Sequence, residues 1–380
     1  MGGMVDAWPE LLATERRIMA RANADPGVTQ KALGELLDIP QQTVSRQIND
    51  MLARGLLLGG ERVSQGRRGQ PSLTLAINPD RVFSLGVSIM ADAVSVMLVD
   101  MAGTERGYRR YRLPVMSREA VLQQAEIGLA ELCEAAGVDP ARVPGIGVGI
   151  TGFIRADRRS FNTPRMLDEW ADVDVAAIFA ERFGRPAWAD NDGNVAAVGE
   201  SLVGIGRWAP TFAYLYIATG FGGGAIVDGA MLAGRHGNAG EYATMLPPLL
   251  YPSPTLELLR QTMAMRGVEF ADVSALVEGF DVTMPGVDEW IAKIADSLSL
   301  VCGACVGVLD PDAIVLGGRI PAALAERLIP HISVPIVPRR GEGRETVPIV
   351  PAAAPGDATA LGAAVLPLQV CIFGDAQRVR

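Results

Sequence analysis

The chain has 380 residues, of which 49% are hydrophobic and 20% are charged, close to ordinary globular usage. The length allows two or three domains, and the composition excludes a mainly disordered chain. The formal net charge is -9, which for the chain as a whole opposes binding to nucleic acid and to anionic membranes. Residues 1–80 are neutral overall, however, so the acidic excess lies entirely in the rest of the chain.

Cysteine usage and hydropathy indicate a cytoplasmic protein. Four cysteines are too few for a disulfide framework. The N-terminus lacks a basic start followed by an apolar run, so we expect no signal peptide. The longest uncharged stretch, residues 208–227, contains Pro210 and four glycines, which predicts a strand, a turn and a strand. We therefore expect no membrane partner.

Three short helical patterns follow one another in the first 55 residues. They cover about residues 9–23, 30–37 with Thr29 as the N-cap, and 41–53. The third pattern has an apolar stripe and, opposite it, a polar face: Gln41, Gln42, Thr43, Ser45, Arg46 and Asn49. Such side chains hydrogen-bond base edges and phosphates in a major groove, which predicts a helix-turn-helix. The alternative is a small helical bundle with a solvated face.

A hairpin pattern follows these helices. Leu56–Leu58 begins one strand, and Leu73, Leu75 and Ile77 alternate in a second. The tip between the strands carries Arg67 and Arg68, flanked by glycines. Arginines on a thin loop can enter a minor groove, where the potential is most negative. The alternative is a solvated basic loop, but together with the helices the pattern predicts a DNA-binding winged helix-turn-helix at residues 1–80.

Residues 81–380 mix strand and helix patterns, which predicts an α/β fold. The predicted strands are 83–90, 93–99, 145–150, 186–189, 212–218 and 313–316. The predicted helices are 117–136, 173–183, 194–204, 255–266, 272–280, 287–309 and one from about residue 358.

Several motifs in this larger part resemble the ROK family of repressors, open reading frames and sugar kinases. They are GIGVGITG at 145–152, ADNDGNVAAVGE at 189–200, YIATGFGGGAIVDG at 216–229, GRHGNAGE at 234–241, DPDAIVLGG at 310–318 and ALGAA at 360–364. Their order and spacing are those of the family, and with the winged helix the resemblance covers nearly the whole chain. It implies an actin/hexokinase-like pair of α/β lobes at residues 81–380, serving effector binding and dimerisation.

The resemblance also implies effector-binding residues. Asn191 and Asp192 can hold adjacent sugar hydroxyls, and the family assigns this aspartate to the sugar, although both residues could simply cap the next helix. Glu241 and Glu257 match sugar-contacting glutamates of the family, or are ordinary carboxylates, and Asn162 is a weaker candidate contact.

The glycine-rich segment 219–224 admits two interpretations. Its bare backbone N–H groups could approach a phosphate, or it could be only a tight hairpin.

Two departures from the family argue against catalysis and metal binding. Kinase members carry an Asp-x-Gly-Gly-Thr turn for the metal and ATP phosphates, whereas here Ser88, Met90 and Ala91 stand at those positions. The family's zinc-site histidine is replaced by Thr244, and the stretch PPLLYPSPTLE that follows contains no cysteine or histidine. We therefore expect no catalytic residue, no cofactor and no metal, and we expect Cys302 and Cys305 to be buried in a helix.

These patterns predict a transcriptional regulator that represses genes of sugar metabolism. Its partners would be operator DNA and a sugar or sugar derivative, and a homodimer would read two half-sites. The alternative is an ATP-dependent sugar kinase with an appended DNA-binding head, in which Asp192 is the general base. A third possibility is a DNA-binding regulator whose cleft no longer binds a sugar.

Overall fold

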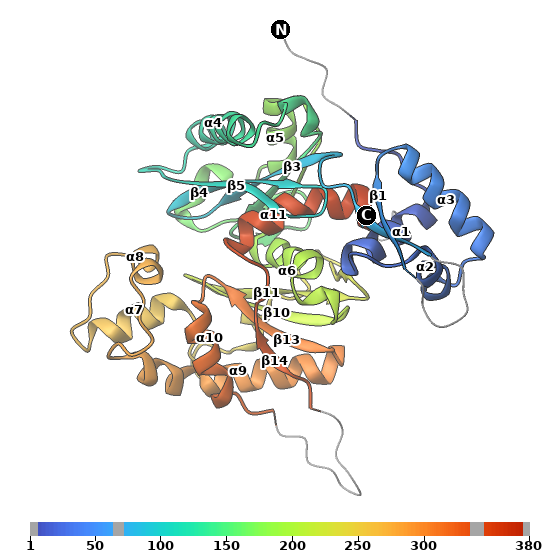
Figure 1. Cartoon of the computed structure of the whole chain (residues 1–380). Helices are drawn as coiled ribbons and strands as arrows, with labels where there is room; N and C mark the ends of the chain where they lie inside the picture. The colour runs from blue at the N-terminus through green and yellow to red at the C-terminus, as the bar shows by residue number, and fades with distance from the viewer. Residues whose placement is uncertain (1–6, 64–71, 335–345, 375–380) are drawn as a thin grey trace, which may run out of the picture. The chain divides into compact units, whose positions relative to one another are not determined.

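The computed structural model describes residues 7–63, 72–334 and 346–374, and the chain divides into two compact units (Figure 1). The first unit comprises residues 1–152, 159–190 and 360–380. The second comprises residues 153–158 and 191–359. Each unit contains its own five-stranded sheet, so the mixed α/β fold predicted from the sequence is confirmed.

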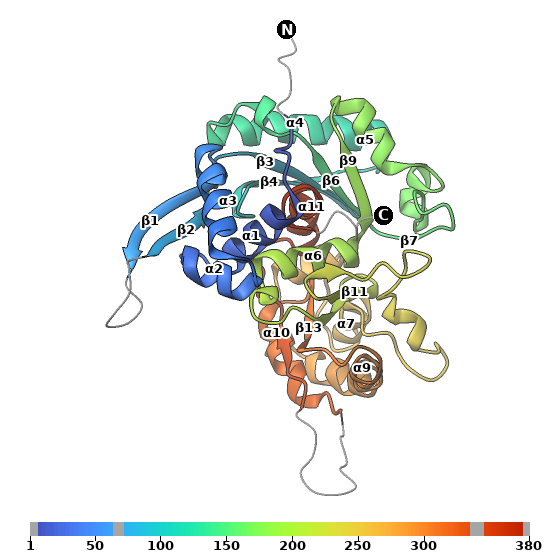
Figure 2. The same cartoon turned by 90° about the vertical axis from the view of Figure 1, so that its right-hand side faces the viewer.

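The first unit begins with a winged helix. Its elements are α1 (Ala13–Ala24), α2 (Gln30–Leu37), α3 (Gln41–Ala53), β1 (Leu57–Val63) and β2 (Ser72–Ile77). The side-chain oxygen of Thr29 accepts a hydrogen bond from the N–H of Ala32 and caps α2, as predicted. Ile18, Leu33 and Ile48 are fully buried between the helices. Strands β1 and β2 pair antiparallel and project from the helices as an arm (Figure 2).

The first helix begins later than predicted. It starts at Ala13, not near Pro9, because Leu12 has an extended backbone and acts as the N-cap. The Glu15 carboxylate accepts a hydrogen bond from the Leu12 N–H at 2.9 Å, which satisfies a donor at the helix start. Residues 8–12, called the N-terminal strap below, therefore precede the helix and have no regular secondary structure.

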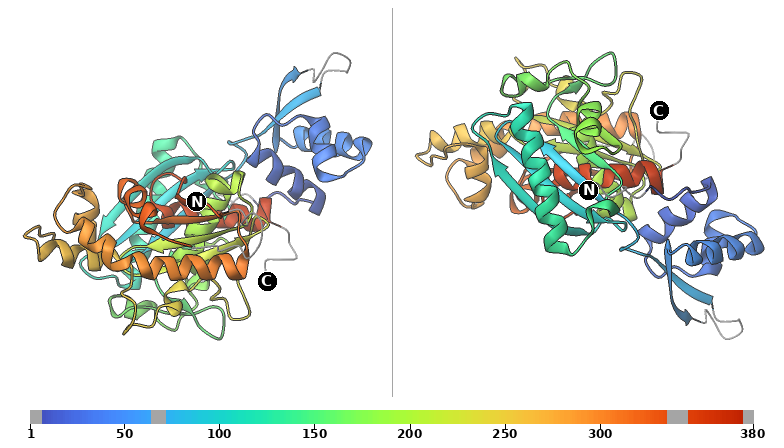
Figure 3. Two further views of the ribbon diagram at one scale, coloured as in Figure 1. Left: turned by 90° about the horizontal axis from the view of Figure 1, so that it is seen from below. Right: turned by 90° about the horizontal axis from the view of Figure 1, so that it is seen from above.

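The sheet of the first unit has the order β5-β4-β3-β6-β9. Its strands are β3 (Phe83–Ile89), β4 (Ala93–Asp100), β5 (Glu105–Arg112), β6 (Ile146–Ile150) and β9 (Ala187–Asn191). The helices are α4 (Arg118–Ala136), α5 (Val175–Phe183) and α11 (Ala358–Leu368), with a π-helical turn η6 (Gln369–Phe373). Shorter elements of this unit are η1 (Pro140–Arg142), β8 (Phe161–Asn162) and η2 (Arg165–Trp170), whereas β7 (Phe153–Ile154) belongs to the second unit. Helix α4 packs on β4 and β5, which is visible from above in Figure 3.

Helix α11 lies directly on the backbone of this sheet. A Cβ atom added to Gly86 would lie 2.4 Å from the Ala360 carbonyl oxygen, and one added to Gly147 would lie 1.8 Å from the Ala363 carbonyl oxygen. Only glycine permits such an approach, so the two glycines fix the position of α11 on the first unit.

The second unit has a sheet with the order β12-β11-β10-β13-β14. The strands are β10 (Phe212–Ile217), β11 (Phe221–Val227), β12 (Ala230–Met231), β13 (Ala313–Gly318) and β14 (Ile349–Pro351). The helices are α6 (Asp192–Val203), α7 (Leu256–Ala264), α8 (Val273–Glu278), α9 (Val287–Leu309) and α10 (Ala322–Leu328), with the turns η3 (Ile205–Arg207), η4 (Tyr242–Met245) and η5 (Ile329–His331).

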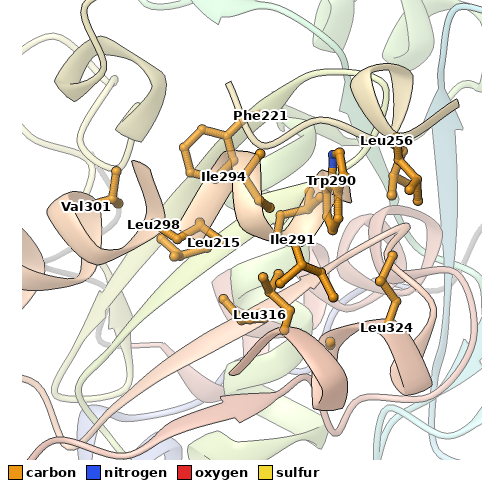
Figure 4. Packing of buried hydrophobic residues seen from close by; sticks show 14 of the residues in the cluster. Leu215, Phe221, Leu256, Trp290, Ile291, Ile294, Leu298, Val301, Leu316 and Leu324 are labelled. Carbon is orange, nitrogen blue, oxygen red and sulfur yellow. The ribbon is translucent and has the colours of Figure 1, made fainter. Parts of the chain in front are cut away.

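Helix α9 supplies much of the core of the second unit. Trp290, Ile294 and Leu298 are fully buried and pack near Leu215 and Leu316 of the sheet (Figure 4). Among the described residues α9 alone is long and apolar enough to span a membrane, and its buried face belongs to this core.

The two cysteines of α9 are buried in the same core, which confirms the predicted packing role. Cys302 is 0% exposed and Cys305 is 1% exposed. Burial raises the pKa of the Cys305 thiol to about 12, which keeps it protonated and unreactive at neutral pH.

Candidate functional sites

Helix α3 presents a polar face on the surface of the winged helix. Gln41, Gln42 and Arg46 are exposed, whereas Val44 and Ile48 on the opposite side are fully buried. Thr43 and Ser45 are partly exposed on either side of Val44, and Asn49 is exposed one turn further along. The predicted division of this helix into a core stripe and a polar face is therefore observed. Such a face has the side-chain types that read a major groove.

The wing is present as an antiparallel pair whose register runs from Leu57 opposite Ile77 to Val63 opposite Ser72. The wing arginines Arg67 and Arg68 lie outside the described residues, so their role stays a prediction. Arg62, on β1, is exposed and adds a positive charge to the arm.

Asn191 and Asp192 lie at the start of α6, where β9 ends. The Asn191 side-chain oxygen accepts hydrogen bonds from the N–H groups of Gly193 and Asn194, at 2.8 and 3.4 Å. One Asp192 oxygen also accepts from the Gly193 N–H at 2.9 Å. The capping interpretation therefore holds for Asn191, whereas Asp192 is the first residue of α6, which begins two residues before the predicted start at Asn194. Asp192 thus lies at the positive end of the helix dipole.

Glu241 is the electrostatic neighbour of Asp192. Burial, and secondarily the Asp192 carboxylate, raises the pKa of Glu241 to about 7. At neutral pH Glu241 is therefore partly protonated beside Asp192. One group accepts and the other can donate a hydrogen bond, which suits a ligand with adjacent hydroxyl groups.

Glycines position these acids. The segment 219–224 forms the β10–β11 hairpin, in agreement with the second of its two predicted interpretations. A Cβ atom on Gly193 would lie 2.7 Å from the Gly223 carbonyl oxygen, and one on Gly240 would lie 2.7 Å from the Gly224 Cα. Bare backbones thus let both the start of α6 and the loop that carries Glu241 press against β11.

Glu257 and Asn162 are placed differently. Glu257 lies in the first turn of α7, where Arg260 donates to its two oxygens at 2.8 and 2.9 Å and Gln261 donates at 2.9 Å. The hydrogen bond to Arg260 lowers the pKa of Glu257, so it is ionised at neutral pH. Asn162 is an exposed residue of β8 in the first unit. Sugar contacts by these two residues stay predictions.

Two residues that support the loop before Glu241 were not singled out as site residues from the sequence. The Asn238 side chain donates to the Ile154 carbonyl and accepts from the Ile154 N–H, both at 2.8 Å. Thr244, at the position of the family's histidine, donates its hydroxyl to the Glu241 carbonyl at 2.7 Å. Asn238 lies inside the GRHGNAGE motif, and this position was the feature of the sequence that could have marked it as a site residue.

The β3–β4 turn, where kinase members bind phosphates, is occupied by protein contacts. Ser88 is fully buried, and its hydroxyl has no hydrogen-bond partner within the described part of the chain. Arg110 donates to the Asp92 carboxylate at 3.1 Å, which neutralises the acid of the turn. Across residues 7–63, 72–334 and 346–374, we find no group of three His, Cys, Asp or Glu side chains placed to hold a metal ion.

Two parts of the chain match known protein families. Residues 84–248 match the ROK family and residues 17–68 match the MarR family. An uncharacterized protein y4fQ of Sinorhizobium fredii is 27% identical over 96% of this chain and 93% of its own. The xylose repressor of Bacillus spizizenii is 25% identical over 57% of this chain and 56% of its own, so the match covers about half of that protein.

Solved structures show the same architecture. A ROK family transcriptional regulator, described as a homolog of the E. coli MLC protein, superposes with a TM-score of 0.65 at 17% identity. That match covers 95% of this chain and 97% of the other, so it includes the winged helix. Kinases are also among the relatives, including a glucokinase of Halalkalibacterium halodurans that is 28% identical over 53% of this chain and 70% of its own.

Proposed function

Because the chain carries a MarR-type winged helix ahead of a ROK family domain, we propose that it is a transcriptional repressor controlled by a sugar or sugar derivative. The observation that carries the proposal is the exposed polar face of α3 in the same chain as the Asp192–Glu241 pair. The named relative that is a xylose repressor supports the same function.

The DNA side of the proposal rests on α3 and the wing. Gln41, Gln42 and Arg46 read base edges, and Thr43 and Ser45 contact phosphates or bases nearby. Arg67 and Arg68 bind the backbone or the minor groove and supply salt-dependent affinity. We propose a homodimer that places two such heads on two half-sites, because a single head covers one half-site.

The effector side rests on the second unit. Asp192 accepts hydrogen bonds from ligand hydroxyls, and Glu241 accepts or donates according to its protonation state. Asn191 positions Asp192 by capping α6. Effector binding changes operator affinity only if the effector binds the DNA-competent and DNA-incompetent states unequally.

Catalysis by the alternative sugar kinase is disfavoured by the β3–β4 turn. Phosphoryl transfer requires a metal and close backbone approach to the phosphates. Here Ser88 offers a hydroxyl where kinase members have an acid, and Asp92 is held by Arg110. Sugar-dependent ADP production that disappears in Asp192→Asn would establish the kinase instead.

The test is fluorescence anisotropy with the DNA upstream of the protein's own gene, in the presence of competitor DNA and at fixed salt. Titrations are repeated with D-xylose and with a panel of other sugars and sugar phosphates. We expect specific binding that one sugar weakens. Specific binding that no sugar changes would refute sugar control, and binding that competitor DNA abolishes would refute an operator at this site.

A further inference from the structure

The N-terminal strap attaches the winged helix to the sheet of the first unit. The indole of Trp8 packs edge-to-face on that of Trp188, with ring centroids 6.3 Å apart and planes at 77°. A Cβ atom on Gly145 would lie 2.7 Å from the Trp188 ring and 3.0 Å from the Trp8 ring. The bare backbone of Gly145 therefore makes room for both rings, and the aromatic pair has a preferred geometry.

The same strap is bonded to the C-terminal end of α3. Arg54, the C-cap of α3, donates to the main-chain carbonyl of Glu10 in the strap. Its guanidinium also pairs with Glu15 at 2.9 Å and with Asp50 at 3.0 Å. Glu15 is 3% exposed, so this pair is shielded from solvent on one side. The strap and Arg54 thus connect Trp8 to the helix with the polar face.

A second attachment lies on η6, the continuation of α11. The Arg16 guanidinium on α1 donates to the Val370 carbonyl at 3.0 Å. The turn η6 continues α11, whose backbone lies against the sheet at Gly86 and Gly147. Trp8 and Arg16 are thus two of the residues that attach the winged helix to the rest of the first unit.

The residues that Trp8 and Arg16 contact lie on β9 and on η6, which continues α11. The chain crosses from one unit to the other in β9 and near the start of α11. The chain enters the second unit briefly at residues 153–158, leaves the first unit again within β9, between Asp190 and Asn191, and returns to it near the start of α11, after Thr359. On β9, Trp188 lies two residues before Asp190, and Asp192 lies directly after Asn191. A ligand that restrains Asp192 would therefore also restrain the end of β9, the strand on which Trp8 packs.

We propose that the N-terminal strap couples β9 to α3, with Trp8 and Arg54 as the coupling residues. The inference rests on the proposed repressor function. Through this connection, binding of DNA at α3 alters how tightly Trp8 is held on Trp188, and the change reaches the β9 backbone next to Asp192. Linkage makes the coupling reciprocal, so a ligand on Asp192 acts on α3 by the same route. Contiguity alone does not establish coupling, and a measured response at β9 does.

The experiment is hydrogen–deuterium exchange on the full chain, with and without the upstream DNA, read on peptides that cover residues 187–191. The variants are Trp8→Ala, the conservative Trp8→Phe, and Trp208→Ala as a matched control, because Trp208 is 58% exposed and lies in the second unit. DNA affinity is measured on every variant by anisotropy. Far-UV circular dichroism and thermal unfolding confirm that each variant is folded.

We expect DNA to slow exchange in β9 of the wild-type protein and of Trp208→Ala, by several-fold in each. In Trp8→Ala we expect specific DNA binding without this response, and in Trp8→Phe a response near that of the wild type. A β9 response that persists in Trp8→Ala overturns the coupling while leaving the repressor function intact, as does a wild-type protein that binds DNA with no change in β9. Loss of all specific DNA binding by the wild type overturns both proposals. If Trp8→Ala does not fold, the same comparison is made with Trp8→Phe and Arg54→Lys, and an undiminished β9 response in Arg54→Lys refutes the proposal.

Discussion

Glu200 of α6 is a fully buried carboxylate whose replacement tests how the second unit holds its effector residues. One of its oxygens accepts N–H groups from Ile205 at 2.9 Å and Ala353 at 2.8 Å, and the other accepts from Ala354 at 3.0 Å. The side chain is 0% exposed, so water does not replace these partners. Glu200 thus ties the helix that begins at Asp192 to the segment between β14 and α11.

Glu200→Gln removes one acceptor and leaves the size of the side chain unchanged. Whichever way the amide is turned, its NH₂ group faces a main-chain N–H that then has no acceptor. One charge-assisted hydrogen bond with a buried partner corresponds to about 2–3 kcal/mol of unfolding free energy. For a unit of this size that lowers the melting temperature by roughly 5–10 °C. Glu200→Ala, which leaves three N–H groups unsatisfied and opens a cavity, is expected to cost more.

The assay is urea unfolding at 25 °C, monitored by circular dichroism and analysed by linear extrapolation. Glu326→Gln is the matched control, because Glu326 is an exposed glutamate on α10 of the same unit. A Glu200→Gln midpoint equal to that of the control, with a difference below about 0.5 kcal/mol, would refute the reasoning.

Three further predictions concern the two sites. Arg46→Ala is expected to cost about 1–3 kcal/mol of operator binding and to relax sequence preference, and anisotropy on a set of single-base operator variants measures both. Replacing Arg67 and Arg68 by Ala is expected to weaken binding at every sequence and to reduce the slope of log K against log salt by about 2; an unchanged slope would contradict the wing assignment. Glu241 has a folded-state pKa of about 7 against an ordinary 4.5, so the folded state binds more protons than the unfolded state between these values and its stability falls as pH rises through them. Unfolding free energies at pH 5 and pH 8 should therefore differ less in Glu241→Gln than in the wild type, and an equal difference would exclude Glu241 as the source.

The sequence predicted best those helices whose ends are marked by residues close to them in the chain. The helices Gln30–Leu37, Gln41–Ala53 and Val287–Leu309 have the predicted bounds, because flanking turn residues and a helical apolar period mark each of them. The first also has the N-cap Thr29. Strand β5, Glu105–Arg112, was not predicted from its sequence ERGYRRYR. It is an edge strand in which four arginines obscure the alternation, and pairing with β4 supplies the stability that its own residues do not signal.

The candidate effector site was predictable for a different reason. Asp192 and Glu241 lie inside glycine-containing motifs that can be seen in the sequence. The structure explains the glycines at 193, 223 and 240, because neighbouring backbones lie too close to them for a Cβ atom. The pairing of Asp192 with Glu241 was not readable from spacing, since almost 50 residues separate them and burial sets the pKa of Glu241. Likewise, the helix predicted from about Pro9 begins only at Ala13, and no local signal shows that Arg54, over 40 residues away, donates to the Glu10 carbonyl in the preceding segment.

The connection between the two sites depends on contacts of this long-range kind. Trp8 and Trp188 lie in none of the motifs, and Gly145 begins the GIGVGITG motif, which does not indicate that two indole rings pack against this glycine. Their proposed role follows from the order of elements along the chain. Strand β9 ends at Asn191, next to Asp192 of the candidate effector site, and the strap leads into the winged helix that contains α3. A repressor of this architecture needs some element that both ligands bias. We propose the strap as such an element in this chain, because Trp8 packs on Trp188 of the strand before Asp192 and Arg54 of α3 donates to the Glu10 carbonyl.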